Sequence, residues 1–253
     1  MRIHCLTSGR VRRKRAPRGV GRYFVEDWGD ETLPVNAFVV EHRDGLLLFD
    51  TGQTAQATED GYFPRWYPFF RLSRFELAPE DEVASQLRRI GYEPSDVRWV
   101  VLSHLHTDHV GGLAAFTSAD VLVSRTEWRD AQGIAGRLRG YLPQYWPSGI
   151  EPTKIDFGGS PIGPFGGSRD LSVDGALVLL PMPGHTRGHM SLLVSGPQGS
   201  FLLGGDAVLS PAELDDALPD VARFCRAEEV KFLAAHDAHA PQVLADAFAE
   251  QLS

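Results

Sequence analysis

Three histidines and one aspartate lie within six residues in the middle of the chain, in the segment HLHTDH that begins at His104. An apolar run at 97–102 precedes them and predicts a buried strand. Side chains two residues apart in an extended backbone point the same way, so His104 and His106 can bind one cation together, whereas Asp108 and His109 face a second point. Imidazole and carboxylate groups are zinc ligands, and the spacing predicts two adjacent metal ions.

Further ligands are expected downstream, because four side chains cannot saturate two metal ions. Three later apolar runs, each predicted to be a strand, end in such a residue. His185 follows the run at 176–183, Asp206 follows 201–203, and His236 ends the run at 231–235. The candidate set then contains five histidines and two aspartates. Titratable residues gathered at strand ends are costly unless something binds there, so a fortuitous polar loop is the weaker interpretation.

Composition narrows the class of protein. The 253 residues are 43% hydrophobic and 23% charged, which is ordinary for a globular chain. With no internal repeat, low-complexity tract or linker, we expect one domain over residues 1–253. The net charge of −8 argues against nucleic acid as a partner. Six basic residues between positions 10 and 18 allow an anionic partner, but a solvated loop or hairpin is the preferred interpretation.

The two cysteines and the absence of long apolar stretches bear on location. Cys5 and Cys225 lie near opposite ends of the chain and form no CxxC pair, which favours free buried thiols in a reducing compartment. No N-terminal apolar segment and no run of 18 apolar residues occurs, so neither export nor a membrane partner is expected. A cytoplasmic protein is therefore predicted.

The elements that must position the ligands alternate between strands and helices. Residues 34–41 and 45–50 predict two strands joined by a turn, and residues 79–91 predict a helix that leads into the strand before His104. This alternation is typical of α/β layering. Residues 133–167 are rich in Gly and Pro and are expected to form a long irregular insertion near the site. The remaining predicted elements are a possible strand at 3–8, strands at 121–123 and 191–195, and helices at 125–131 and 240–252.

Aromatic residues are concentrated in two segments that are not expected to be regular. Prolines at 64 and 68 disfavour a helix or a central strand across residues 61–75. Aromatic side chains in such segments cover the core, line an apolar pocket or form a subunit contact, which leaves a homodimer open. We assign them to a substrate pocket suited to an acyl chain: Tyr62, Phe63, Trp66, Tyr67, Phe69, Tyr141, Tyr145 and Trp146.

Taken together, the motifs resemble those of metallo-β-lactamase-fold hydrolases. Besides the HxHxDH segment with its following Gly111-Gly112, the chain carries Asp50-Thr51-Gly52, a GHT segment around His185 that continues to His189, Gly204-Gly205-Asp206 and His236-Asp237. The compact length, the LPV sequence before the first of these motifs and the closing His-Asp pair are similar to the N-acyl homoserine lactone lactonases. The resemblance implies an α/β (α+β) fold, a four-layer αββα sandwich with a dinuclear site at one edge.

The resemblance also divides the ligands between the two metals. It implies that His104, His106 and His185 hold one ion, that Asp108, His109 and His236 hold the other, and that Asp206 bridges them. Asp50 and His189 would support the ligands from behind, whereas from the residues alone Asp50 is equally well a cap of its turn. His239 is an unsuitable substitute for His236.

The implied activity is that of a dinuclear zinc hydrolase that opens a lactone ring, with N-acyl homoserine lactones as substrates; iron, manganese or cobalt are alternative metals. Metal-activated water would attack the carbonyl, and Asp108 would relay a proton to the leaving group. Asp206 stands where zinc β-lactamases have Cys or Ser, which argues against antibiotic hydrolysis. Leu209 stands where the lactonases commonly have a substrate-binding Tyr, and the segment from Asp206 to His236 is short. Hydrolysis of another ester, a thioester or a phosphoester is therefore the alternative, and a non-catalytic metal-binding protein is a third hypothesis.

Overall fold

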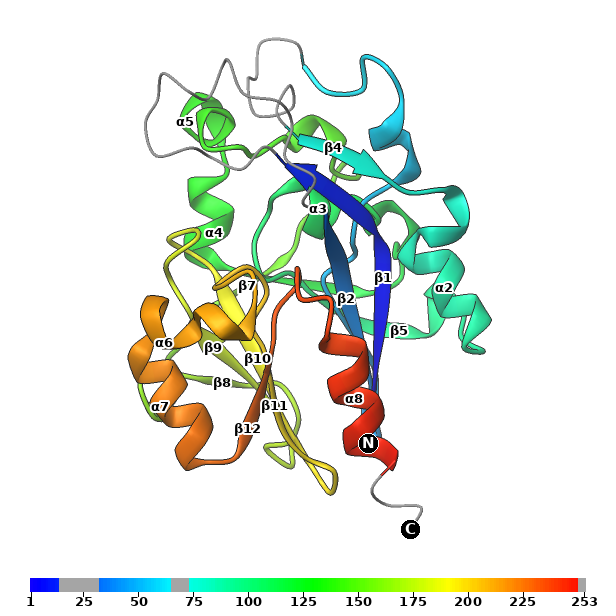
Figure 1. Cartoon of the computed structure of the whole chain (residues 1–253). Helices are drawn as coiled ribbons and strands as arrows, with labels where there is room; N and C mark the ends of the chain where they lie inside the picture. The colour runs from blue at the N-terminus through cyan, green and yellow to red at the C-terminus, as the bar shows by residue number, and fades with distance from the viewer. Residues whose placement is uncertain (14–31, 65–72, 250–253) are drawn as a thin grey trace.

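The computed structural model describes residues 1–13, 32–64 and 73–249. Two β-sheets lie face to face, with α2 on the outer side of one and α6 and α7 on the outer side of the other (Figure 1). The expected αββα sandwich is confirmed. Among the described residues, no helix has the length and apolar character needed to cross a membrane.

The first sheet has the strand order β4-β1-β2-β3-β5-β6-β7. Its β4-β1-β2-β3 half is antiparallel, and its β3-β5-β6-β7 half is parallel. Because both faces of this sheet are covered, β3 and β5 are apolar at nearly every position instead of alternating. The strands are β1 (Arg2–Arg13), β2 (Thr32–His42), β3 (Gly45–Phe49), β4 (Ser73–Glu76), β5 (Val97–Val101), β6 (Asp120–Ser124) and β7 (Thr153–Ile155).

The second sheet has the order β12-β11-β10-β9-β8 and is antiparallel except for the β11–β12 pair. In that parallel pair Leu203 lies opposite Leu233, so the segments that follow β11 and β12 leave the sheet side by side. These segments carry Asp206 and His236. The strands are β8 (Arg169–Asp170), β9 (Leu177–Pro181), β10 (Met190–Gly196), β11 (Gly199–Leu203) and β12 (Val230–Leu233).

Three apolar layers hold the sandwich together. The central layer packs the two sheets together through side chains such as Phe38, Leu47 and Leu179. The second joins the first sheet to α2, and the third joins the second sheet to α7. Each fully buried Leu or Phe contributes about 1.5–3 kcal/mol. The helices are α2 (Val83–Arg89), α3 (Thr107–Val110), α4 (Arg125–Asp130), α5 (Gly133–Leu138), α6 (Leu214–Ala217), α7 (Pro219–Ala227) and α8 (Ala240–Ala249).

The predicted strands at 34–41, 45–50 and 97–102 correspond to β2, β3 and β5. The prediction of an irregular insertion at 133–167 is wrong in part, since this segment contains α5 and also β7, which pairs with β6. β7 has only three residues, two of them exposed, and it forms an edge of the sheet, so it leaves no periodic signal in the sequence. The predicted helix at 79–91 begins as a 3-10 turn, and its α-helical part starts at Val83.

Two further differences concern the ends of the chain and the segment before His236. The possible strand at 3–8 extends to Arg13, so the first part of the basic run belongs to β1, while the part beyond Arg13 lies outside the described residues. The helix predicted at 240–252 is described as far as Ala249. α6 and α7 were not predicted; they cover the outer face of the second sheet between Asp206 and β12.

Candidate metal centre

The segment after β5 separates its polar side chains into two directions. His104 and His106 lie before α3, and the backbone of His106 is extended, with φ −73° and ψ 159°. Asp108 and His109 lie within the single turn of α3. The change from extended to helical backbone therefore turns the second pair away from the first, as the spacing in the sequence predicts.

One group of side chains brings three imidazole nitrogens together from two loops. Nε2 of His104 lies 3.1 Å from Nδ1 of His106, and that atom lies 3.0 Å from Nε2 of His185. Nitrogen ligands about 2.0–2.1 Å from a tetrahedral zinc lie roughly 3.3 Å from one another. The spacing of the three nitrogens therefore suits a single ion; we call these residues the first cluster.

Asp108, His109 and His236 form a second group, which we call the second cluster. Nε2 of His236 lies 3.7 Å from Oδ2 of Asp108, and Nε2 of His109 lies 4.0 Å from Oδ1 of the same carboxylate. The distances are longer than in the first cluster, but all three donor atoms face one point. A carboxylate and two imidazoles are a usual ligand set for zinc.

The carboxylate of Asp206 lies between the two clusters. Oδ2 lies 3.7 Å from Nε2 of His185 in the first cluster and 3.4 Å from Nε2 of His236 in the second. Oδ1 lies 3.2 Å from Nε2 of His109. One carboxylate that faces histidines of both clusters is placed to share its oxygens between two ions.

Two buried atoms of this group lack hydrogen-bond partners among the described residues. Nε2 of His109 and Oδ1 of Asp206 are buried and close together, yet they form no hydrogen bond. Leaving such an atom unsatisfied costs about 1–3 kcal/mol. A cation between them would satisfy both atoms, so the residues present fit the metal that their chemistry implies.

Asp50 orients His109 and fixes the start of the metal-binding segment. Its Oδ1 accepts from the backbone N–H of Ser103 at 2.7 Å, and its Oδ2 accepts from the Ser103 hydroxyl and from Nδ1 of His109, both at 2.8 Å. Because Nδ1 of His109 donates to Asp50, the lone pair of Nε2 faces the centre. Asp50 has a φ of 60°, a strained conformation for a residue other than glycine, of the kind found at functional sites.

Two other contacts hold ligands from behind. His236 donates from Nδ1 to the carbonyl oxygen of Pro34 at 2.7 Å, which leaves Nε2 for the centre. The backbone N–H of Asp206 donates to Nε2 of His189 at 3.2 Å, so His189 contacts the backbone of a ligand and does not join either cluster. Gly205, the residue before Asp206, has a φ of 53°, and a Cβ there would lie 2.8 Å from Nε2 of His189. The close approach of this backbone to His189 therefore requires glycine.

The two clusters differ in protonation. Burial and the neighbouring histidines lower the pKa of His104 well below its usual value, and burial lowers the pKa of His106 to about 4. Burial alone would lower the pKa of His236, but the Asp206 carboxylate outweighs it and raises that pKa to about 9. For His109 the carboxylates of Asp206 and Asp50 likewise outweigh burial and raise the pKa. Metal binding at the second cluster must therefore displace protons.

The structure describes five of the eight aromatic residues assigned to the substrate pocket. The ring of Tyr141 lies 5.2 Å from that of His106, directly beside the first cluster. Tyr62 stacks on Tyr145 at 4.4 Å and meets Phe63 edge-on at 4.9 Å. Trp146 stacks on Trp128, a contact with the core. Trp66, Tyr67 and Phe69 lie outside the described residues.

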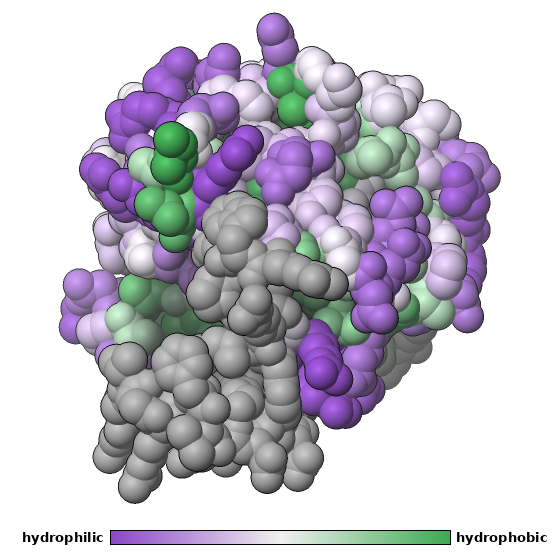
Figure 2. All heavy atoms as spheres, turned by 90° about the horizontal axis from the view of Figure 1, so that it is seen from above, coloured by the Kyte–Doolittle hydropathy of each residue, from purple (hydrophilic) through white to green (hydrophobic). Residues whose placement is uncertain are grey.

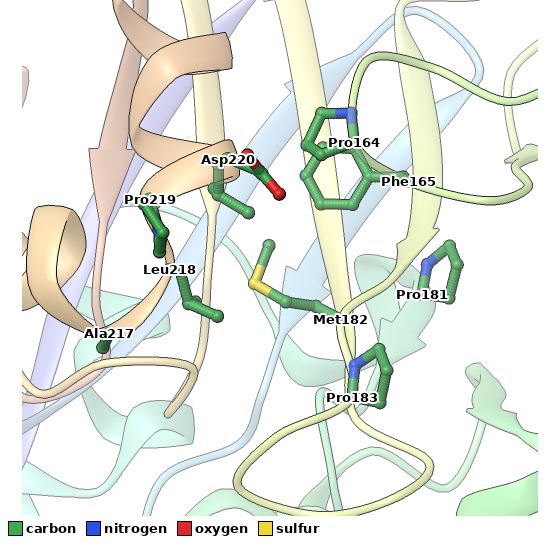
Figure 3. A pocket seen from close by; sticks show the side chains of 10 residues that line it. Pro164, Phe165, Pro181, Met182, Pro183, Ala217, Leu218, Pro219 and Asp220 are labelled. Atoms are coloured by element: carbon green, nitrogen blue, oxygen red, sulfur yellow. The ribbon is translucent and has the colours of Figure 1, made fainter.

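Leu209 follows β11, and its backbone N–H donates to the Glu213 carboxylate at 3.1 Å. A cavity of about 240 Å³ lies near the loop that carries His185, between the end of β9 and the start of α7 (Figure 3). Its walls include Phe165, Met182 and Leu218, and none of the candidate ligands lines it.

The role of Glu127, a fully buried carboxylate in α4, could not be found from the sequence. Ser124-Arg125-Thr126-Glu127 has the pattern of a helix capping box, which explains the residue as a purely local feature. The structure shows only half of that box: the Ser124 hydroxyl accepts from the Glu127 backbone N–H at 3.0 Å. The carboxylate itself accepts from the Leu105 backbone at 3.0 Å and from the Thr186 hydroxyl at 2.7 Å, so it contacts both histidine loops.

Another group of possible ligands, His42, Asp44 and Asp174, lies at the turn between β2 and β3. Here the polar atoms are already paired. Nε2 of His42 lies 3.2 Å from the Asp174 carboxylate, Nδ1 of His42 accepts from the Asp44 backbone, and Arg43 lies 3.2 Å from Asp174. With a guanidinium in place, this group does not need a cation.

The chain matches a family model and several known proteins over most of its length. Residues 30–248 match the model of the metallo-beta-lactamase superfamily. A probable metallo-hydrolase of Mycobacterium tuberculosis is 36% identical over 204 residues, which cover 78% of this chain and 64% of that relative. An N-acyl homoserine lactonase of Bacillus thuringiensis is 33% identical over 192 residues, 74% of this chain and 69% of that protein.

Among solved structures, an N-acyl homoserine lactone hydrolase superposes with a TM-score of 0.74. It is 25% identical, and the superposition covers 95% of each chain. That enzyme holds the product N-hexanoyl-L-homoserine at its catalytic metal centre.

Proposed function

This chain belongs to the metallo-beta-lactamase superfamily, and we propose that it is a dinuclear zinc hydrolase that opens the ring of lactones, with N-acyl homoserine lactones as its substrates. The observation that carries the proposal is the position of Asp206. Its carboxylate faces His185 on one side and His109 and His236 on the other, and its Oδ1 lacks a hydrogen-bond partner within residues 1–13, 32–64 and 73–249. A single ion would leave one of the two clusters without a metal.

When bound, two zinc ions supply Lewis acidity toward a carbonyl oxygen and a leaving alkoxide and lower the pKa of water to about 7. The residues of the chain orient the ligands of these ions and carry protons. Asp50 and the Pro34 carbonyl fix the ring orientation of His109 and His236 through the far ring nitrogens. The side chain of Asp108 is 16% exposed, compared with 8% for Asp206, and is therefore the carboxylate better placed to carry a proton to a departing alkoxide.

In the part of the chain that the structure describes, the hydroxyls of Tyr141 and Tyr145 already have hydrogen-bond partners and do not replace the phenol of the lactonases at Leu209. The Tyr145 hydroxyl donates to the carbonyl of Tyr62. The Tyr141 hydroxyl is bonded to Glu127, which together with burial raises the Tyr141 pKa. Polarisation of the substrate carbonyl therefore depends on the metal centre, and Tyr141 contributes an apolar ring beside His106.

The substrate class has separate support. The relative from Bacillus thuringiensis is named as an N-acyl homoserine lactonase, and the superposed hydrolase binds an acyl homoserine product. The aromatic group of Tyr62, Phe63 and Tyr145 offers an apolar surface of the kind that an acyl chain requires.

A second candidate is hydrolysis of an anionic ester, thioester or phosphoester, and one observation favours it. Arg139 and Arg187 both approach Asp130, and the carbonyl oxygen of Arg139 accepts from Nε2 of His106 at 3.2 Å. Both arginines belong to segments that adjoin the first cluster, Arg139 through its backbone and Arg187 as the second residue after His185, and a guanidinium would suit a substrate that carries negative charge.

A pH-indicator screen of the zinc-loaded protein tests the proposal, because opening a lactone ring releases one proton. We expect two zinc ions per chain and proton release from N-acyl homoserine lactones. Two zinc ions with turnover of a thioester or phosphoester but not of lactones would reject the lactone assignment. Fewer than two zinc ions would reject the dinuclear centre.

A further inference from the structure

The start of α4 touches both loops that supply the first cluster. The Ser124 hydroxyl donates to the carbonyl oxygen of Gly188 at 2.5 Å, in the loop between His185 and His189. A Cβ at position 188 would overlap the backbone of Glu127, so this loop lies directly against the helix. α4 is thus the structural element between the His104–His106 segment and the His185 loop.

Glu127 joins these two loops by hydrogen bonds. Oε1 accepts from the backbone N–H of Leu105, the residue between His104 and His106. Oε2 accepts from the hydroxyl of Thr186, the residue after His185. Tyr141 and the backbone of Gly188 also hydrogen-bond to this carboxylate.

We propose that Glu127 is the positioning residue of the first metal cluster: its buried carboxylate joins the backbone between His104 and His106 to the residue beside His185. The inference rests on the proposed metal centre. Two of the bonds of Glu127 are to residues directly beside ligands, Leu105 and Thr186, and none is to a ligand atom, so Glu127 acts on the ligands through the segments that carry them. It sets the distance between two loops that come from different sheets of the sandwich.

The chemistry of the site requires a carboxylate. Four donors point at Glu127, and two carboxylate oxygens offer about four acceptor positions with no hydrogen atom of their own. Glutamine at this position would keep the shape but replace one oxygen with an NH₂ group. That group would face an N–H or O–H donor, and the two loops would separate to relieve the contact.

The test compares Glu127→Gln with the wild type in zinc binding by chelator competition. We expect Glu127→Gln to lower the affinity for one of the two zinc ions by about 10- to 100-fold, as is usual for a group that orients ligands. The affinity for the other ion should be unchanged. Zinc anomalous scattering from crystals of the variant should show reduced occupancy between His104, His106 and His185 and full occupancy at the second cluster. Cobalt substitution should change the absorption bands of one ion only.

Glu82→Gln is the matched control. Glu82 also accepts from a hydroxyl and a backbone N–H, those of Thr54 and Ala55 at 3.0 and 2.8 Å, at the start of α2. We expect it to lower the melting temperature without changing either zinc affinity. Equal zinc affinities for Glu127→Gln and the wild type would overturn the inference, and so would equal losses in both control and test variants.

Thr186→Val provides a second route if Glu127→Gln does not fold. It removes one donor from the same carboxylate, so a smaller loss of affinity for the same ion is expected, and no loss would overturn the inference. A wild-type protein that binds no zinc would instead reject the proposed function, so the two failures are distinguishable.

Discussion

The substitution Asp50→Asn should disturb the orientation of the ligand His109 while leaving the ligand itself in the chain. Asp50 is 1% exposed and accepts three hydrogen bonds, one of them from Nδ1 of His109. Asparagine has the same shape and tolerates the φ of 60° at this position, so the backbone should not change. One oxygen becomes an NH₂ group, and if Oδ1 continues to accept from Ser103, that group faces His109.

Facing a donor, His109 must accept through Nδ1 and carry its proton on Nε2, which then points toward the second cluster instead of offering a lone pair. Zinc binding there would need the unfavourable tautomer. We expect its affinity for the second ion to fall by about 10- to 100-fold, or about 1.4–2.7 kcal/mol. The first cluster should keep its zinc affinity. The ring nitrogen that donates to Asp50 belongs to His109, which is not one of the three histidines of that cluster.

The assay is zinc competition against a fluorescent chelator, with melting of the metal-free protein measured in parallel. Asp81→Asn is the control, since the one hydrogen bond of the Asp81 carboxylate within the described ranges is to a local backbone N–H, that of Ala78 at 2.9 Å. It should leave both zinc affinities unchanged. Wild-type zinc affinity at both clusters in Asp50→Asn would refute the claim that Asp50 sets the tautomer of His109. A loss of affinity at the first cluster alone would show that Asp50 supports the first ion and not the second.

Three further predictions concern pH, metal removal and the core. Because the pKa of His236 is raised to about 9, this residue holds a proton at pH 7 that the second ion must displace, so affinity at the second cluster should rise with pH up to about 9. The pKa of His106 is lowered to about 4, so affinity at the first cluster should be nearly constant above pH 5; equal slopes in chelator titrations from pH 6 to 9 would contradict this. Removal of zinc by a chelator should lower the free energy of unfolding by about 4 kcal/mol for each ion relative to protein with free zinc at a thousand times its Kd, and identical melting temperatures would argue against a resident metal. Leu179→Ala, in the fully buried layer between the sheets, should cost about 2–5 kcal/mol in urea unfolding with both zinc affinities retained, and a cost below 1 kcal/mol would show that the layer repacks around the cavity.

The strands that carry the candidate ligands could be predicted because each is a short apolar run that ends in a polar residue. The runs before His104, His185 and His236 correspond to β5, β9 and β12. Burial of both faces makes such strands continuously apolar, and this signal survives in a single sequence. The order of strands within each sheet is not contained in these local patterns.

The orientation of the ligands could not be predicted, since it depends on contacts between distant segments. Asp50 and His109 are 59 positions apart, and so are Glu127 and Thr186. In the sequence Asp50 precedes a Thr-Gly pair and suits a turn equally well, and Glu127 suits a helix cap. Only the packing of loops from both sheets assigns their carboxylates to histidine segments.

The aromatic residues illustrate a third case, in which composition predicts the kind of surface but not its place. Tyr141 lies beside His106, whereas Trp146 stacks on Trp128 in the core, although both come from the same segment. α5 in that segment exposes Ile134 and Leu138. Figure 2 shows that apolar side chains stand among polar ones on the face of the molecule seen from above. Aromatic and aliphatic content alone does not distinguish a pocket wall from a core contact.

Zinc anomalous diffraction from crystals of the zinc-loaded protein tests the central claim most directly. The account predicts two peaks, one among His104, His106 and His185 and one among Asp108, His109 and His236, about 3.5–4 Å apart with the Asp206 carboxylate between them. A single peak at one cluster, or two peaks that Asp206 does not bridge, would contradict it.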